Sequence, residues 1–147
     1  MTLELPRVVW DELRARLEAA YPDEGCGLLA GVPGPDGAVV SKLVPLVNEE
    51  RETPRRRYVI APAAWRRAED ECRGVGLELL GVYHSHPDSV LGATPSEHDR
   101  AQAWPGLSYV IVAVRDGRAE VGRSWRLADQ RDRFAEETLT ILDRAVV

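Results

Sequence analysis

Histidine and acidic residues gather in one stretch of this 147-residue chain. All three histidines, His84, His86 and His98, lie within fifteen residues of one another, and Asp99 follows directly. Residues two apart in a strand point to the same face, so His84 and His86 can bind one ion from a strand end. Two imidazoles and a carboxylate are typical zinc ligands, and three protein ligands leave a fourth position open for water. The stretch therefore predicts one catalytic Zn²⁺ site.

Asp99 is the candidate third ligand, because a short helix is expected to begin just before it. Thr94 suits the N-cap, Pro95 suits the first helical position, and Glu97 stands three residues after the cap. Ser96 and Asp99 are three residues apart, so in such a helix they share a face. The Ser96 hydroxyl and the positive end of the helix would then favour an oxygen anion near the metal. Amide hydrolysis requires this stabilisation.

Hydrolysis also needs a general base, and the candidate carboxylates are Glu24, Asp88 and Glu97. Spacing alone does not choose among them. Glu24 is attractive because it stands at the entrance of the apolar segment Gly25 to Val32, where partial burial would raise its pKa. The other two carboxylates stay open as alternatives at this point.

Strand and helix patterns surround these residues along the whole chain. The expected strands cover residues 2–5, 25–32, 38–47, 57–60, 78–85, 108–114 and 118–127. The expected helices follow Pro6, cover residues 62–73, and close the chain from Asp129 to Asp143. Residues 115–117 form the expected hairpin turn between the last two strands. This order predicts one α/β domain over residues 1–147, with a mixed sheet flanked by helices.

Composition and charge narrow the function classes. Hydrophobic residues make up 44% of the chain, charged residues 29%, and the net charge is -5, as in ordinary globular proteins. Arg55 to Arg57 is the longest basic run, so no nucleic-acid partner is expected. Because no apolar run approaches the roughly 18 residues of a membrane span, a cytoplasmic protein is predicted. Cys26 and Cys72 stand far apart, which favours reduced core residues.

Two motifs resemble the JAMM or MPN-plus family of zinc metalloproteases, in its short bacterial type. The first is Glu24-Gly25-Cys26-Gly27-Leu28-Leu29, and the second is Gly81-Val82-Tyr83-His84-Ser85-His86-Pro87 followed by Ser96-Glu97-His98-Asp99. The resemblance covers most of the chain and implies an MPN-like fold, which is cytidine deaminase-like. It implies zinc on His84, His86 and Asp99. It further implies Glu24 as the general acid and base, and Ser96 as a group that helps to stabilise the tetrahedral intermediate.

The resemblance also implies a substrate class and leaves two alternatives. Short bacterial members resemble hydrolases of the bond after the diglycine tail of ubiquitin-like and sulfur-carrier proteins, so such a carrier is the expected partner. The alternatives are a non-catalytic MPN interaction scaffold and a protein associated with DNA repair. The intact ligand set argues against the scaffold. The repair-associated relatives resemble a His-Asn-His-Pro motif, whereas this chain has Ser85 between the two histidines, which argues against that alternative. The sequence leaves open the carrier, the choice between isopeptide and C-terminal extension, and the oligomeric state, including a homodimer.

The loop between the second histidine and the aspartate departs from the family pattern. Twelve residues separate His86 from Asp99, whereas the family usually has about ten, and we expect the extra length around Val90 to Ala93. Trp104 follows closely enough to line a substrate groove, while the other tryptophans are expected to pack. His98 is expected to face solvent.

Overall fold

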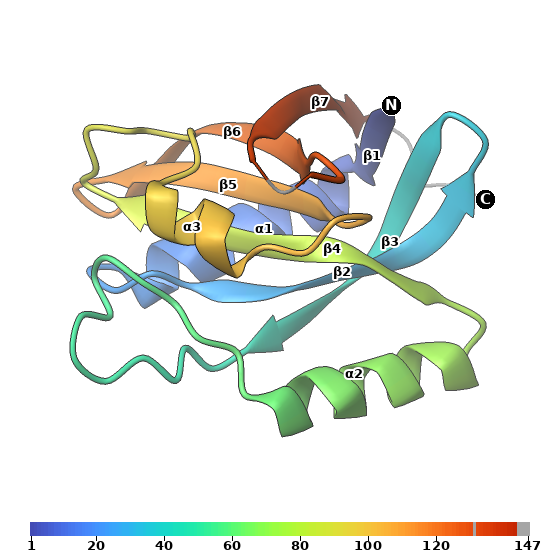
Figure 1. Ribbon diagram of the computed structural model, residues 1–147, viewed down its shortest axis with the longest axis horizontal. Coiled ribbons are helices and arrows are strands. Elements are labelled where there is room, and N and C mark those ends of the chain that lie inside the picture. The colour runs from blue at the N-terminus through green and yellow to red at the C-terminus, as the bar shows by residue number, and fades with distance from the viewer. Residues whose placement is uncertain (131, 144–147) are drawn as a thin grey trace.

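The computed structural model describes residues 1–130 and 132–143 as one closed mixed sheet with three helices (Figure 1). The strands are β1 (Thr2–Pro6), β2 (Cys26–Gly34), β3 (Gly37–Leu46), β4 (Glu78–Pro87), β5 (Ser108–Arg115), β6 (Arg118–Leu127) and β7 (Phe134–Leu142). The helices are α1 (Arg7–Ala20), α2 (Pro62–Gly74) and α3 (Glu97–Gln102). Neighbouring strands follow the order β1-β3-β2-β4-β5-β6-β7, with both parallel and antiparallel pairs. The predicted α/β class with a mixed sheet is confirmed.

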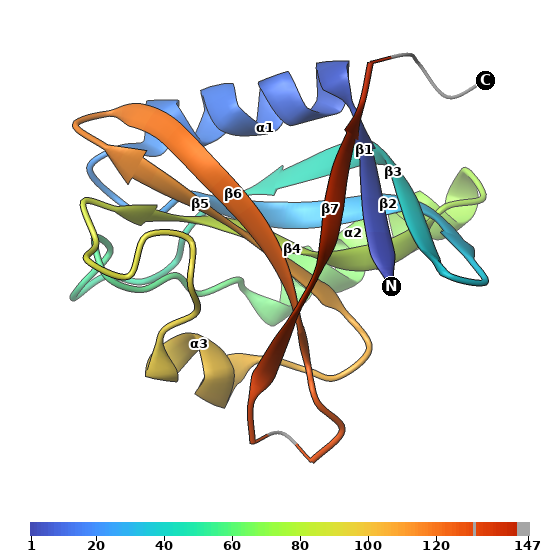
Figure 2. The same ribbon diagram turned by 90° about the horizontal axis from the view of Figure 1, so that it is seen from above.

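Helix α1 lies against one side of the central strands, and α3 lies on the opposite side (Figure 2). The α1 sequence places Val9, Leu13 and Leu17 at helical spacing, and all three are buried. They pack in one cluster with Leu29 of β2 and Tyr83 of β4, among others. The larger hydrophobic core therefore forms between α1 and the sheet.

The opposite side of β4 carries a smaller apolar cluster. Val82 packs there with Ala68 of α2 and Tyr109 of β5. Because side chains alternate along a strand, His84 and His86 point to this same side as Val82. The fold thus directs both histidines toward α3 and away from the α1 core.

The predicted C-terminal helix over Asp129 to Asp143 is wrong. The segment forms β7, which pairs in parallel with β1 and antiparallel with β6, and so closes the sheet. β-branched Thr138, Thr140 and Ile141 fit a pleated surface better than a helix. Pairing with a strand from the other end of the chain outweighs the weak helical spacing. Arg131, inside the predicted helix, lies outside the described residues.

Two smaller predictions also fail. Residues 57–60 have no strand structure, and they run as an irregular segment into α2. Helix α3 begins at Glu97 with Ser96 as its N-cap, two residues later than the predicted Thr94 cap. Ser96 and Asp99 form the reciprocal capping bonds, so the N-cap is Ser96.

In the described ranges, no helix has the length and apolar character to cross a membrane.

Candidate metal centre

Strand β4 supplies two buried imidazoles from the interior of the sheet. His84 is fully buried and His86 nearly so. Cys26 of β2 pairs with His84 on one side, and Ala113 of β5 pairs with His86 on the other. β5 pairs with the backbone of both residues, and β2 pairs with it as far as His84. The imidazoles are therefore presented from a strand that is held in the sheet by ladder hydrogen bonds.

Helix α3 supplies the third group through its capping arrangement. The Asp99 amide donates to Ser96 Oγ at 3.0 Å, and the Ser96 amide donates to Asp99 Oδ2 at 2.9 Å. These reciprocal bonds fix the first turn and turn the Asp99 carboxylate toward β4, where it is buried. The capping bonds between Ser96 and Asp99 thus orient the carboxylate from within the helix.

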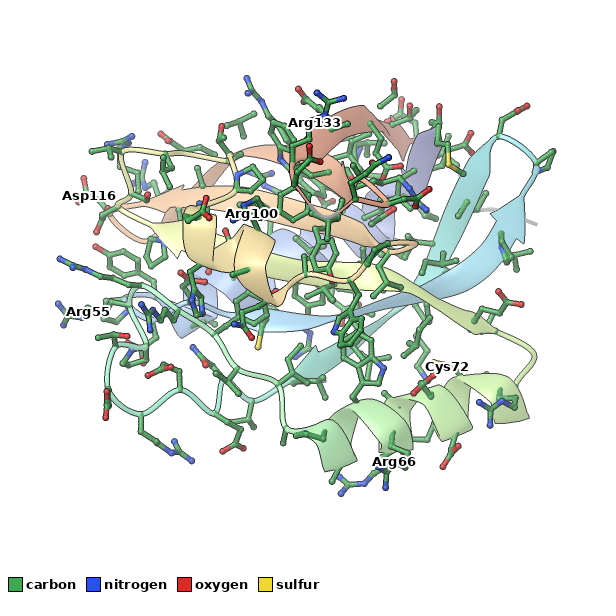
Figure 3. All side chains as sticks on the ribbon, viewed as in Figure 1. Arg55, Arg66, Cys72, Arg100, Asp116 and Arg133 are labelled. Atoms are coloured by element: carbon green, nitrogen blue, oxygen red, sulfur yellow. The ribbon has the colours of Figure 1, made fainter. Side chains whose placement is uncertain are left out.

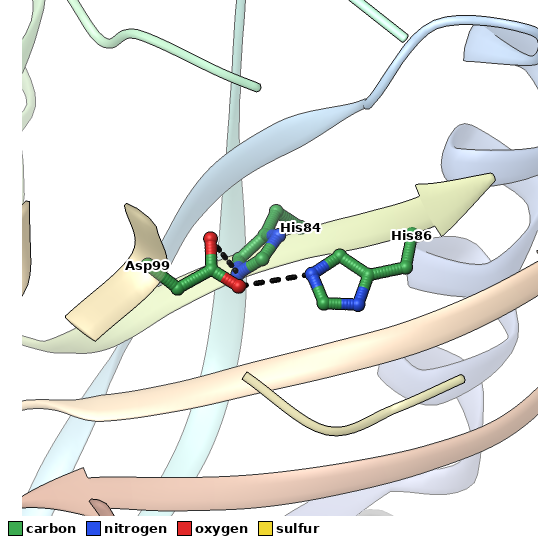
Figure 4. A group of neighbouring side chains, drawn as sticks. All are labelled: His84, His86 and Asp99. Atoms are coloured by element: carbon green, nitrogen blue, oxygen red, sulfur yellow. Dashed lines mark hydrogen bonds and ion pairs between the residues drawn. The ribbon is translucent and has the colours of Figure 1, made fainter. Parts of the chain in front are cut away.

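The three side chains converge from separate segments of the chain (Figure 4). His86 Nε2 lies 2.9 Å from Asp99 Oδ2, and His84 Nε2 lies 3.8 Å from Asp99 Oδ1. One ligand atom from each of the three residues lies within 4.8 Å of the others. A single ion with bonds of about 2 Å nearly spans that separation.

The hydrogen-bond pattern around His86 calls for a cation. Its Nδ1 lies 2.9 Å from the carbonyl oxygen of Gly92, which only accepts, so Nδ1 carries a hydrogen. In the neutral ring, Nε2 then directs a lone pair at Asp99 Oδ2, itself an acceptor. Two acceptors at this distance repel each other unless a proton or a metal cation lies between them.

His84 gives an independent sign of a bound ion. Both ring nitrogens are buried and have no hydrogen-bond partner among the described residues. Leaving a buried polar atom unpaired costs about 1–3 kcal/mol, and native proteins rarely do so without a function. Two imidazoles and a carboxylate are a suitable donor set for a transition metal, so the residues present fit a metal ion.

The electrostatics of the site favour positive charge. Burial alone would lower the pKa of His84, but the carboxylates of Asp99 and Glu24 outweigh it and raise that pKa. Burial would likewise raise the pKa of Asp99, yet His84 and His86 hold it below its ordinary value. The buried Asp99 carboxylate therefore keeps its negative charge and attracts a cation.

Glu24 lies directly beside His84, at the entrance to β2. It is only 3% exposed, and its Oε1 lies 3.3 Å from His84 Nδ1. Its backbone is fixed on both sides: the amide donates to the carbonyl of Pro54 at 2.7 Å, and its carbonyl accepts from Asn48 Nδ2 at 3.0 Å. The carboxylate is therefore held at the site by the segment that precedes α2.

The other two base candidates lie apart from the three converging groups. Asp88 accepts hydrogen bonds from the Tyr21 hydroxyl and from the Asp116 amide. Glu97 is exposed and forms an ion pair with Arg100, although the sequence suggested a bond to the helix cap. Of the three carboxylates, only Glu24 contacts a candidate metal ligand.

Sequence reasoning missed several residues that position the site. The Tyr58 ring stacks on His84 with centroids 4.4 Å apart, from the irregular segment that was predicted to be a strand. Ser85 Oγ accepts from the Gly25 amide at 2.9 Å and joins β4 to the segment at Glu24. Ser85 stands inside the quoted motif, so its position was a signal for this role. Tyr58 offered no such signal, because neither spacing nor a motif connects it to the histidines.

Two pockets of different character adjoin these groups. The first, of about 300 Å³, is termed the aromatic pocket, and its lining residues are Glu50, Tyr58, Val59, Ile60, Trp65, Val82, His98, Asp99, Gln102, Trp104 and Tyr109. The second, of about 360 Å³, is termed the arginine pocket, and its lining residues are Glu24, Arg55, Arg56, His86, Pro87, Asp88, Ser89, Val90, Leu91 and Ser96.

Two predictions about residues near the aromatic pocket have different outcomes. Trp104 lines this pocket, as expected. His98 is half-buried against the same pocket, contrary to the expectation that it faces solvent.

Comparison with known proteins gives consistent matches. Residues 6–128 match the family described as prokaryotic homologs of the JAB domain. A probable TtuB-protein conjugate cleaving protease of Thermus thermophilus is 35% identical over 81% of this chain and 75% of its own length. The desampylase of Haloferax volcanii is 38% identical over 66% of each chain. The CysO-cysteine peptidase of Mycobacterium tuberculosis is 31% identical over 84% of this chain and 80% of its own length.

Solved structures share the fold. A protein of Desulfitobacterium hafniense superimposes with a TM-score of 0.84 at 29% identity, covering 97% of this chain and 94% of its own. A JAB1/MPN domain protein from Archaeoglobus fulgidus superimposes with a TM-score of 0.59 at 20% identity, covering 95% of this chain and 99% of its own. The second likeness concerns the fold alone, and it agrees with the predicted MPN-like architecture.

Proposed function

The chain belongs to the prokaryotic homologs of the JAB domain, and from this premise we propose that it is a zinc-dependent peptidase. Its substrate would be a ubiquitin-like or sulfur-carrier protein, hydrolysed at the bond after a C-terminal Gly-Gly. One observation carries the proposal: buried Glu24 lies beside His84, which converges with His86 and Asp99 and whose ring nitrogens have no hydrogen-bond partner among the described residues. The names of the relatives, which include a conjugate cleaving protease, a desampylase and a CysO-cysteine peptidase, support the substrate class.

His84, His86 and Asp99 would hold one zinc ion. Imidazole and carboxylate ligands suit zinc, and three protein ligands are typical of catalytic rather than structural sites. When bound, zinc acts as a Lewis acid and brings the pKa of a water molecule close to neutrality. Gly92 supports this role, since its carbonyl fixes the His86 tautomer that presents Nε2 to the ion.

Glu24 would move the proton during hydrolysis. Its carboxylate takes a proton from the attacking water and passes it to the nitrogen of the leaving amine as the C–N bond breaks. The second proton of the water also ends on the leaving nitrogen as the new acid ionises. The products are therefore the carrier carboxylate and an ammonium group, and Glu24 returns to its ionised state. The bonds from the Glu24 backbone to Pro54 and Asn48 keep the carboxylate in place throughout.

Ser96 would stabilise the negative oxygen that develops on the scissile carbonyl. Ser96 Oγ accepts a hydrogen bond from the Asp99 amide, and no described acceptor takes its own hydrogen. The hydroxyl can therefore donate toward a developing oxyanion, and it lines the same pocket as Glu24 and His86. The cap orients the hydroxyl in advance, so little reorganisation is needed during the reaction.

The aromatic pocket would receive the Gly-Gly tail. An extended peptide without side chains can approach the metal-binding groups more closely than one with side chains. Tyr58, Trp65 and Trp104 provide apolar walls next to Asp99 for the residues before the glycines. We further propose that residues 1–147 act as one catalytic domain in the cytoplasm, where such carriers are substrates.

The test is hydrolysis of defined carriers followed by mass spectrometry. Zinc-loaded protein is incubated with sulfur-carrier proteins that end in Gly-Gly followed by an extension, with and without a chelator. We expect release of the carrier at the second glycine, loss of activity with chelator, and a kcat at least about 10³-fold lower for Glu24→Gln. The Glu24→Gln protein should still bind one zinc. Binding of carriers without any cleavage would instead favour the interaction scaffold.

A further inference from the structure

The position of Glu24 assigns the two pockets to the two sides of the scissile bond. Glu24 lines the arginine pocket, whereas Asp99 lines the aromatic pocket. The group that delivers a proton to the leaving amine must lie within hydrogen-bond reach of its nitrogen. The leaving group therefore occupies the arginine pocket, and the acyl side with its Gly-Gly tail occupies the aromatic pocket.

The arginine pocket presents two guanidinium groups that have no ion-pair partner among the described residues. Arg55 and Arg56 are both exposed, and neither forms an ion pair within residues 1–130 and 132–143. Arg55 lies at the same end of the molecule as Asp116, on the loop that precedes α2 (Figure 3). Unpaired guanidinium groups beside a binding cavity are suited to carboxylates, which they bind through two parallel hydrogen bonds.

The loop that carries these arginines is fixed to the proton donor. The Arg56 amide donates to the carbonyl of Thr53 at 3.0 Å, which closes a turn. Within the same turn, the carbonyl of Pro54 accepts from the Glu24 amide at 2.7 Å. The two guanidinium groups and the Glu24 carboxylate are therefore held in one short, hydrogen-bonded unit.

Asp88 lines the same pocket but forms no ion pair with Arg55 or Arg56. Its Oδ1 accepts from the Asp116 amide and its Oδ2 from the Tyr21 hydroxyl, so both oxygens already have donors. Val90 and Leu91 complete the lining with apolar side chains from the loop between β4 and α3. A small group that combines a carboxylate with a short side chain would match this environment.

We propose that the arginine pocket binds the α-carboxylate of the leaving amino acid, so that Arg55 and Arg56 select a C-terminal extension over a lysine-linked conjugate. This inference rests on the proposed function. In a one-residue extension, the carboxylate lies two bonds from the amine nitrogen, next to the scissile bond. In an isopeptide, the nitrogen ends a lysine side chain, and no carboxylate lies near it.

The reaction balances with water as the only co-reactant. Water adds to the carbonyl carbon of the last glycine, the C–N bond breaks, and the carrier leaves as a carboxylate. The leaving nitrogen becomes an ammonium group, so a zwitterionic amino acid is released. Its carboxylate is unchanged from substrate to product, and Arg55 and Arg56 can hold it in both states.

The experiment compares three substrates that differ only at the leaving group. One sulfur-carrier protein ending in Gly-Gly is prepared with an added alanine, with an alanine amide, and with an isopeptide bond to a lysine side chain. We expect the zinc-loaded enzyme to favour free alanine over the alanine amide by about tenfold in kcat/KM. The Arg55→Ala/Arg56→Ala double variant should abolish that preference. Arg57→Ala, whose side chain does not line the pocket, is the matched control and should retain it.

A binding measurement separates this inference from the proposed function. Fluorescein-labelled peptides that end in Gly-Gly-Ala, as free acid or amide, are titrated with two proteins. One is the Glu24→Gln variant, and the other also carries Arg55→Ala and Arg56→Ala. Tighter binding of the acid that depends on the two arginines supports the pocket assignment, even where no carrier is cleaved. Equal cleavage rates and equal affinities for the acid and the amide would overturn the pocket assignment. If all three substrates were still cleaved in that case, the proposed peptidase activity would be supported all the same.

Discussion

The two faces of β4 differ in what they bury. On one face, Tyr83 packs with Leu13 and Leu17 of the 14-residue helix α1 in the larger hydrophobic core. On the other face, His84 and His86 are just as buried, but they meet polar and aromatic groups: Asp99 of the six-residue helix α3, Glu24 and Tyr58. The nitrogens of His84 have no hydrogen-bond partner among the described residues. The α1 face stabilises the fold through apolar contact. The α3 face maintains a buried polar cluster, which costs stability and prepares the site for an ion.

The sharpest test of this contrast is one substitution on each face. His86→Ala removes a proposed ligand, so we expect loss of stoichiometric zinc binding and of all measurable hydrolysis. Leu13→Ala opens a cavity in the α1 core and should cost about 2–5 kcal/mol of unfolding free energy. Zinc affinity is measured by competition with a chromophoric chelator, and stability by urea unfolding in excess chelator.

The contrast between the faces would be wrong if Leu13→Ala lost zinc affinity and His86→Ala lost stability. Leu13→Ala should retain zinc affinity within about threefold wherever it is folded, because the two faces share no side chain. His86→Ala should unfold in chelator at a urea concentration close to that of the parent protein. A stable His86→Ala protein that binds zinc as tightly as the parent would exclude His86 as a ligand.

A smaller effect is expected from Ser96, which has a structural and a chemical role on the α3 face. Ser96→Ala removes both the cap acceptor and the proposed oxyanion donor. We expect kcat to fall about 10²-fold and the unfolding free energy to fall by about 1 kcal/mol. Ser96→Asp keeps a cap acceptor but has no hydroxyl to donate, so it should recover stability without recovering kcat. Recovery of both would reduce Ser96 to a purely structural residue.

The sequence was sufficient for the elements whose pattern is local. The alternation of His84 and His86 along one strand placed both rings on one face, and the structure has them there. The N-cap was harder, because Thr94 and Ser96 each precede an acidic residue by three positions. Asp99 of α3 contacts His86 of β4, and the local pattern does not predict this tertiary contact. Ser96, which caps through Asp99, is therefore the residue that begins the helix.

The elements that sequence reasoning missed depend on distant partners. β7 is a strand because β1, at the opposite end of the chain, offers a parallel edge for it. No local sequence pattern near residues 134–142 predicts pairing with that edge. The stacking of Tyr58 on His84 likewise joins an irregular loop to a strand. Loops that approach a site in space carry no periodic pattern, so their residues are found only once the fold is known.

The pH dependence of the metal-free protein should also separate the two faces. The folded-state pKa of His84 is raised above its ordinary 6.5 by Asp99 and Glu24, although burial opposes the shift. A raised folded pKa contributes stability below the unfolded pKa and loses it as pH rises through the folded pKa. In chelator, Tm should therefore fall as the pH rises above about 6.5, and Asp99→Asn should flatten this slope.

The matched control for this measurement is again Leu13→Ala. The tyrosines of its apolar cluster, Tyr83 and the adjoining Tyr21, have pKa values raised above the ordinary 10.0 and stay neutral in this range. The substitution should therefore lower Tm by a similar amount at each pH. With saturating zinc the slope should reverse, since the metal competes with protons for the same imidazoles and binds better as pH rises. A metal-free Tm that increases over this pH range would contradict the assigned electrostatics of His84.

The smallest expected effect concerns two tryptophans, one on each face. Trp125 of β6 donates its indole N–H to the carbonyl of Ala93 at 2.9 Å, next to Gly92, whose carbonyl accepts from His86. Trp125→Phe removes this donor while keeping an aromatic ring, so the loop should orient His86 less firmly. We expect zinc affinity to fall by about three- to tenfold, since groups outside the ligand shell tune a metal site modestly. Trp10→Phe, in the α1 core, should change stability and leave zinc affinity unaltered. Equal zinc affinities for the two variants would show that the loop after β4 does not position His86.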